Sequence, residues 1–326
     1  MNTSIKKLVG TACVAALTAN ILSTSAMADE GHVLKIQNFI GTIDVVTGDY
    51  DEIKVTDADG APVDRSSAGI SIDGGETIKQ VNCRQNKLSV DISIGNWGWK
   101  KRSGGYKNLN EYPKVKITAP ATTHVIIDDS VIFGEIGTIG SADLRVRSCG
   151  DLELADVTGE LDLRISGSGD VSMDNAGPAI VSVSGSGDLV GGNFASLDLS
   201  VSGAGDVEIE DVIGFADIST SGSGDVEIGE IGDGLEYRGS GSSNLDAESV
   251  TGDVNIRTSG SGDVSIEDGQ VGTLKIVSSG SSNVEFDGDA VDIEARASGS
   301  SDVYVNRPSG ALQTSDSGAG DVHVDG

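Results

Sequence analysis

Residues that usually carry catalysis and metal binding are scarce in this chain of 326 residues. It has three histidines, His32, His124 and His323, and none belongs to a metal-ligand pair such as H-x-x-x-H. We find no Ser-His-Asp or Cys-His set, and no glycine-rich loop that follows a strand and opens a helix. The sequence therefore predicts no catalytic residues, no metal site and no cofactor.

Basic residues are also few. The chain has 22 Lys and Arg against 51 Asp and Glu, a net charge of −29. Residues 141–326 alone hold 35 acids and 8 bases, a net charge of −27. Such a surface repels nucleic acids and anionic lipids and attracts cations. This acidity excludes nucleic acid as an expected partner.

Long apolar runs are absent except near the N-terminus. Lys6 and Lys7 precede a mostly apolar or small, uncharged run, 8–22, and Ala26-Met27-Ala28 offers a cleavage site before Asp29. This order is typical of a secretory signal peptide, and the run is too short for a membrane anchor. We expect residues 1–28 to be removed from an exported bacterial protein, periplasmic or at the cell surface, that does not span the membrane.

Cysteine is nearly absent. Once the signal is removed, Cys83 and Cys149 remain. In an oxidising compartment two cysteines can form one disulfide, and the alternative is two unpaired thiols.

What the sequence does contain is a repeat. The phrase Ser-Gly-Ser-Gly-Asp-Val recurs, and its Asp or Asn position (the Asx position) returns every 18–20 residues. The ten Asx positions are Asp151, Asp170, Asp188, Asp206, Asp225, Asn244, Asp263, Asn283, Asp302 and Asp321. Ten units therefore fill residues 141–326.

Each unit alternates apolar and polar residues on both sides of the turn. Leu161, Leu163 and Ile165 precede one turn, and apolar residues return one and three positions after the Asx, as in Val207 and Ile209. Such alternation indicates strands with one buried face, and a single unit cannot bury that face alone. The sequence predicts an all-β solenoid (β-helix) of about ten coils; a sandwich of short hairpins is the competing fold.

Stacked coils would turn sequence columns into rows of side chains. The acids of the Asx row would repel one another unless their oxygens accept turn N–H groups or cations lie between them. Six residues before the Asx, several Arg residues recur with acids two positions earlier, which indicates a partly charge-compensated outward face.

Residues 29–140 also alternate as β-strands and form either irregular first coils or a cap over the solenoid end. One glycine-rich stretch there combines aromatic rings with cations: Trp97, Trp99, Lys100, Lys101, Arg102, Tyr106 and Lys107. Rings with cations suit sugar faces or anionic polymers, so this stretch is a candidate ligand-binding loop. The alternative is that its rings pack on the flank of the solenoid.

The opening Val33–Phe39 with Gly41–Val45, and the serial Ser-Gly-Ser-Gly-Asp-Val turns from 166 to 322, resemble a bacterial family of unknown function. It is the auto-transporter adhesin, head GIN domain family. The resemblance covers most of the mature chain and implies a right-handed β-helix-like fold in exported proteins. It also implies adhesion and supplies no catalytic residues.

We therefore expect an exported, non-enzymatic adhesin-like or scaffolding module that binds a cell-surface polysaccharide, another polymer or a partner protein. Two alternatives stay open. One is a polysaccharide-degrading β-helix enzyme, and the other is a structural protein that assembles end to end as a homo-oligomer.

Overall fold

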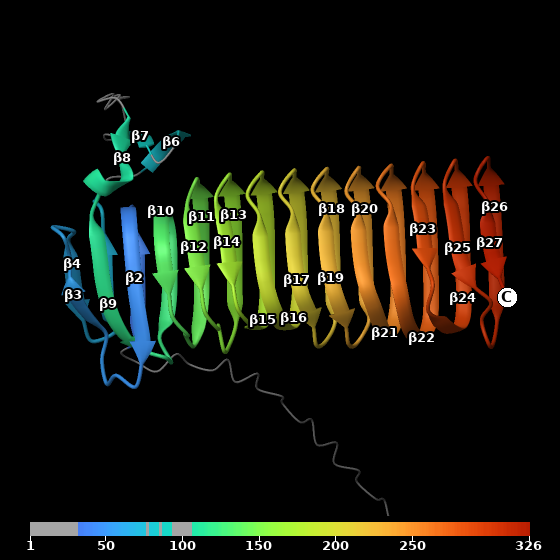
Figure 1. The fold of residues 1–326 in the computed structure, drawn as a ribbon, viewed down its shortest axis with the longest axis horizontal. Coiled ribbons are helices and arrows are strands. Elements are labelled where there is room, and N and C mark those ends of the chain that lie inside the picture. The colour runs from blue at the N-terminus through green and yellow to red at the C-terminus, as the bar shows by residue number, and fades with distance from the viewer. Residues whose placement is uncertain (1–31, 76–77, 85–86, 93–105) are drawn as a thin grey trace, which may run out of the picture.

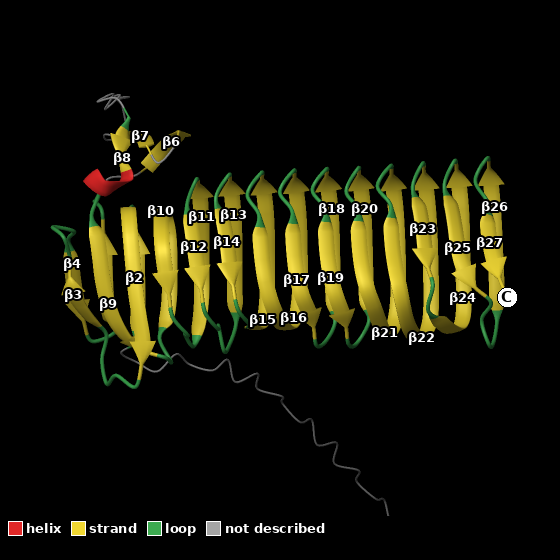
Figure 2. Ribbon diagram, in the orientation of Figure 1, coloured by secondary structure: helices red, strands yellow, loops and turns green. Residues whose placement is uncertain are grey.

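The structure is a computed structural model that describes residues 32–75, 78–84, 87–92 and 106–326. Strands make up most of the described chain, and the only helical segment there is the 3-10 turn η1 (Leu109–Glu111) (Figure 2). The first strands are β1 (Val33–Gln37), β2 (Ile40–Gly48), β3 (Lys54–Asp57), β4 (Val63–Ser66), β5 (Gly69–Asp73), β6 (Ile78–Arg84), β7 (Lys87–Ile92), β8 (Lys107–Asn108), β9 (Lys114–Pro120) and β10 (His124–Ile136). The repeat region follows with β11 (Ser141–Ser148), β12 (Asp151–Leu154), β13 (Leu161–Gly167), β14 (Asp170–Met173), β15 (Ala176–Gly185), β16 (Leu189–Gly203), β17 (Val207–Val212), β18 (Ala216–Gly222), β19 (Val226–Ile231), β20 (Leu235–Gly241), β21 (Leu245–Gly260), β22 (Val264–Gly280), β23 (Asn283–Phe286), β24 (Asp289–Gly299), β25 (Asp302–Asn306), β26 (Leu312–Gly318) and β27 (Val322–Asp325).

The repeat region is a stack of coils (Figure 1). Each coil contributes one strand to a first layer and, after the Ser-Gly-Ser-Gly turn, one to a second layer. The first layer contains β11, β13, β15, the second half of β16, β18, β20, the second halves of β21 and β22, β24 and β26. The second layer contains β12, β14, the first half of β16, β17, β19, the first halves of β21 and β22, β23, β25 and β27.

Each strand pairs in parallel with the equivalent strand of the next coil. Residues at the same position of the repeat therefore form rows along the stack. Leu163 pairs with Leu144 on one side and with Val181 on the other, and Asp151 pairs with Asp170. With β10 counted as the coil in front of the ten repeats, the solenoid has about 11 turns. The predicted all-β solenoid is confirmed. The hairpin sandwich is wrong for the repeat region, because hairpins would pair antiparallel and the strands observed there pair in parallel.

The inward columns form one continuous apolar interior. Leu161, Leu163 and Ile165 are at most 2% exposed, as are Val207 and Ile209 on the other side of the turn. Fully burying a side chain of this size contributes about 1.5–3 kcal/mol. Because each row continues into the next coil, the buried cluster runs without a break from Leu34 to Val305.

Several polar groups in this interior have hydrogen-bond partners from neighbouring positions of the stack, whereas the buried hydroxyls of Thr123 and Ser243 have none among the described residues. The buried Tyr237 hydroxyl lies 2.9 Å from Thr220 Oγ1 in the preceding coil. Gly239 leaves room for that ring, since a Cβ there would lie 2.7 Å from the Tyr237 hydroxyl. Thr258 lies 2.9 Å from Ser278 Oγ and 2.7 Å from Ser282 Oγ.

The N-terminal region contains both coil strands and capping strands. β1 and β2 pair in parallel with β10, and β5 and β9 extend the two layers beyond them. β3 and β4 then pair antiparallel with β9 and β5. Strands that run against the stack interrupt the parallel order at this end.

Between β5 and β9 the chain leaves the stack and forms a separate sheet, β6-β7-β8, seen beside the turns in Figure 1. Cys83 on β6 and Cys149 in the turn after β11 form a disulfide with their Cα atoms 6.2 Å apart. The bond ties this small sheet to the turn of the first repeat coil.

Candidate functional site

The acids of the Asx row are used to join coils. Asp170 Oδ1 accepts the backbone N–H of Asp188 at 3.1 Å, and Asp188 Oδ1 accepts that of Asp206 at 2.9 Å. The same bond recurs from Asp206 through Asn283, and again from Asp302 to Asp321. The expected use of these oxygens on N–H groups is present, but the donor belongs to the next coil rather than to the residue's own turn.

A second row of such bonds lies at the opposite corner, and the sequence analysis did not identify it. Asp156 Oδ1 accepts the N–H of Asn175 at 3.3 Å, and Asn175 Oδ1 accepts that of Asn193 at 3.0 Å. Asp211 bonds Glu230 in the same way. Each of these residues lies five positions after the Asx of its unit, and the sequence analysis followed the columns only to the third position after the Asx.

The outward face of the first layer is charge-compensated. Arg238 contacts Asp217 in the preceding coil at 2.8 Å and also Glu236 in its own strand. Lys275 lies 3.1 Å from Glu294, and its hydrogen bond holds the pKa of that carboxyl below its usual value. These pairs are solvent-exposed, so each contributes only about 0–1 kcal/mol. Their main effect is to leave this face with little net charge.

The outward face of the second layer contains acids and no cations. From β12 to β27, the strands of this layer include no Lys or Arg. Glu208, Glu227 and Asp246 lie side by side on successive coils and are exposed. We call the acids of β17, β19 and the first half of β21 the acidic face: Glu208, Glu210, Asp211, Glu227, Glu230, Asp246 and Glu248.

The acidic face is hollowed. A depression of about 1010 Å³ is lined by Glu208, Glu227 and Glu248, and also by Gly191 and Gly192. The pKa of Asp246 beside it is raised, first by desolvation and then by the charges of Asp225, Glu267 and Asp263. Carboxylates on adjacent strands, in a layer whose strands include no Lys or Arg, favour the binding of positively charged groups.

A second depression, of about 890 Å³, lies on the first layer and is partly apolar. Ile180 and Phe215, 56% and 44% exposed, line it together with Asp162 and Asp198. His124 Nδ1 and Ser141 Oγ lie 2.7 Å apart at its edge. Within the described residues no acid bonds the other nitrogen of His124, so this contact lacks the third group that orients a catalytic base.

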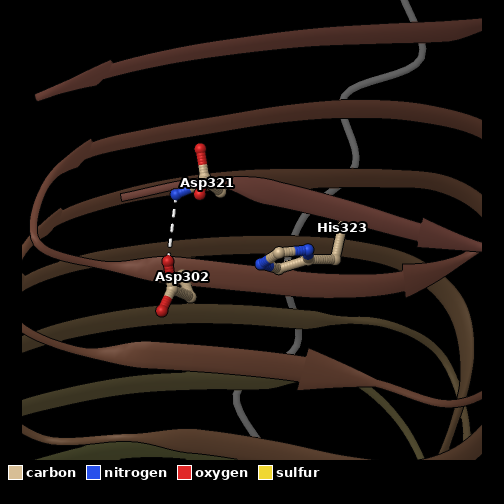
Figure 3. Close-up of side chains that lie close together, drawn as sticks. All are labelled: Asp302, Asp321 and His323. Carbon is tan, nitrogen blue, oxygen red and sulfur yellow. Dashed lines mark hydrogen bonds between the residues drawn. The ribbon is translucent and has the colours of Figure 1, made fainter. Parts of the chain in front are cut away.

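One group of mixed donors lies on the last two coils. Asp302, Asp321 and His323 bring one ligand atom each within 4.8 Å of the others (Figure 3). Asp302 Oδ1 accepts the Asp321 N–H at 3.0 Å, and the His323 ring stacks on Tyr304 with centroids 4.7 Å apart. The sequence analysis considered His323 only for a histidine partner nearby in the chain. Two of its neighbours here, Asp302 and Tyr304, instead belong to the preceding coil.

The predicted ligand-binding loop falls mostly outside the described residues, which begin again at Tyr106. Trp97, Trp99, Lys100, Lys101 and Arg102 all belong to that undescribed part. Tyr106 is 49% exposed, and Lys107 begins β8. The loop therefore stays a prediction.

No helix among the described residues is long and apolar enough to cross a membrane. The family model described as "Putative auto-transporter adhesin, head GIN domain" matches residues 49–233 and 215–326. The match begins after Val33–Val45, the opening on which part of the resemblance depended. No curated protein and no solved structure matches the chain.

Proposed function

Because the chain belongs to the auto-transporter adhesin, head GIN domain family, we propose that it is an exported, non-enzymatic module that binds a partner at the cell surface. Family membership and the solenoid fold support an adhesin-like module. The partner is a polymer or protein that presents positively charged groups, and the acidic face is the surface that contacts it.

The observation that carries this proposal is the contrast between the two outward faces. On the first layer, Arg238, Lys275 and Arg296 are paired with acids. On the second layer, Glu208, Glu227 and Asp246 repeat on adjacent strands with no cation in the layer. Adjacent strands are about 4.8 Å apart, so a partner with regularly spaced cations can contact several coils at once.

The test is binding of the purified mature protein to cell-envelope preparations of its source organism. The variant Glu208→Gln/Glu227→Gln/Asp246→Asn removes three charges from the acidic face. Three exposed charge contacts of about 0.2–1 kcal/mol each predict a loss of roughly tenfold in affinity.

The matched control removes three acids from the exposed segment that follows β2, as Asp49→Asn/Asp51→Asn/Glu52→Gln. It changes the net charge by the same amount and should bind as the wild type does. Equal loss in both variants would attribute binding to net charge alone and contradict a defined contact face.

The Trp97–Lys107 loop remains a second candidate contact, because it combines three aromatic rings with cations that the acidic face lacks. Trp97→Ala/Trp99→Ala should weaken binding to an acidic glycan if the loop recognises one. Unchanged binding across a glycan array would remove the loop from the proposal.

Export is supported by the signal-like N-terminus and by the family description. N-terminal sequencing of the protein recovered from the source organism should begin at Asp29. A chain that retains Lys6 and Lys7 and stays inside the cell would contradict export.

A further inference from the structure

We propose that Asp302, Asp321 and His323 bind one divalent transition-metal ion, with Zn²⁺ as the representative. The site lies on β25 and the last coil and does not depend on the acidic face or on the partner proposed above.

The three side chains offer a mixed set of donors. Two carboxylates supply oxygen and the imidazole supplies nitrogen, with one atom from each within 4.8 Å of the others (Figure 3). Zinc–nitrogen and zinc–oxygen bonds are about 2.0–2.2 Å long, so modest rotation of exposed side chains closes the set around one ion. Imidazole with carboxylate suits zinc and its neighbours in the first transition row better than it suits calcium.

The last carboxylate of the Asx row, that of Asp321, differs from the others. Asp188 and Asp206 each use one oxygen to accept the N–H of the next coil. Asp302 does the same toward Asp321, which fixes its carboxylate beside the site. Among the described residues Asp321 accepts no such bond, so both of its oxygens are available to an ion.

The imidazole is held in place without using its nitrogens. His323 pairs with Tyr304 across the two strands, and the rings stack at 4.7 Å with an angle of 13° between their planes. The equivalent positions two and three coils earlier hold Glu285 and Ser265. The column therefore changes to a stacked aromatic pair at the coils where the two carboxylates meet.

Three protein ligands leave at least one coordination position of zinc for water or another ligand. A dication also relieves the repulsion between the two carboxylates. The site is thus an exchangeable metal site on the surface of the solenoid.

Isothermal titration of the mature full chain with ZnCl₂ tests the proposal. The wild type should bind one Zn²⁺, and addition of Zn²⁺ should shift the imidazole ¹⁵N resonances of His323. His323→Ala and Asp321→Asn should each weaken binding at least about tenfold, since even outer-shell partners of metal ligands contribute about 10- to 100-fold.

Glu285→Gln is the control, because it removes an acid from the same column two coils before His323. It should bind zinc as the wild type does, and far-ultraviolet circular dichroism should show all variants folded. Zinc binding that survives in His323→Ala, or that falls equally in Glu285→Gln, would assign the ion to the acidic surface in general and overturn the proposal.

Discussion

At the scale of single residues, the first glycine of each Ser-Gly-Ser-Gly turn sets how closely the coils approach. Gly167, Gly185 and Gly203 have φ values of 108°, 120° and 145°, a region that residues with a Cβ resist. Their columns also leave no space: a Cβ on Gly203 would lie 2.2 Å from the carbonyl oxygen of Gly185. This position is Ser148 in the first repeat coil, also with a positive φ, and glycine in every later coil.

Gly203→Ala should therefore lower the free energy of unfolding by about 1–3 kcal/mol or more, through backbone strain and overpacking together. Gly48→Ala serves as the control, since a Cβ there first meets Tyr50 at an ordinary 3.4 Å and φ is not positive. Urea denaturation of both variants measures the difference. Equal stability of the two would contradict the close approach of coils at this turn.

The charge on Asp246 makes stability depend on pH. Its pKa is raised in the folded protein, so between its unfolded and folded pKa values the native state binds more protons than the unfolded state. Stability at this site therefore falls as pH rises through that range. Asp246→Asn should raise the melting temperature at pH 7, and the gain should vanish below the unfolded pKa near 3.8. A variant that melts below the wild type at pH 7 would contradict this.

At the scale of elements, the β6-β7-β8 sheet is the least integrated part of the described chain. It shares no ladder with the solenoid, and the disulfide to Cys149 closes a loop with a sequence separation of 66 residues. Loop closure of that length stabilises a fold by about 4 kcal/mol in the chain-entropy model. The sheet depends on this bond more than the stacked coils do.

Reduction of the disulfide should speed amide hydrogen exchange in β6 and β7 and leave β17 and β19 protected. The variant Cys83→Ser/Cys149→Ser should behave as the reduced wild type does. Exchange that rises equally in the solenoid strands would show that the small sheet supports the stack, contrary to the prediction.

The pairing of elements that repeat could be predicted from the sequence, and the pairing of elements that occur once could not. The alternation of Leu161, Leu163 and Ile165 within a fixed period determines both the buried face and the register, because a one-residue slip would expose every apolar side chain. The β6-β7-β8 insertion has no such column to align. Its own pairings are local, as between Arg84 and Lys87, and the bond that ties it to the stack is a disulfide between residues 66 positions apart.

At the scale of the whole molecule, stacking converts small differences between columns into extended surfaces. Arg145, Arg164 and Arg238 place cations along one layer, and their absence from the other layer leaves the acidic face. The sequence analysis recognised the paired row but not the uncompensated one, since it examined the outward columns before the turn more closely than those after it. The Asp302, Asp321 and His323 group was missed because His323 was considered only for a histidine partner, although Asp302 and Asp321 belong to the identified Asx row.

Binding through the acidic face should weaken as salt is added. The Debye length falls from about 10 Å at 0.1 M to about 3 Å at 1 M ionic strength, so contacts between exposed charges are largely screened at high salt. Envelope binding measured between these concentrations should drop steeply for the wild type and less for Glu208→Gln/Glu227→Gln/Asp246→Asn. Salt-independent binding would instead favour an aromatic contact such as the Trp97–Lys107 loop.

The columns themselves are the premise of every surface described above, and pulsed electron paramagnetic resonance measures them directly. Spin labels would be placed at Ser172 and, in turn, at Asp246, Glu285 or His323, which lie four, six and eight coils further along one column. With about 4.8 Å per coil, the expected distances are about 19, 29 and 38 Å. Distances that fail to grow in equal steps with coil number would contradict the stacked columns, and with them the acidic face.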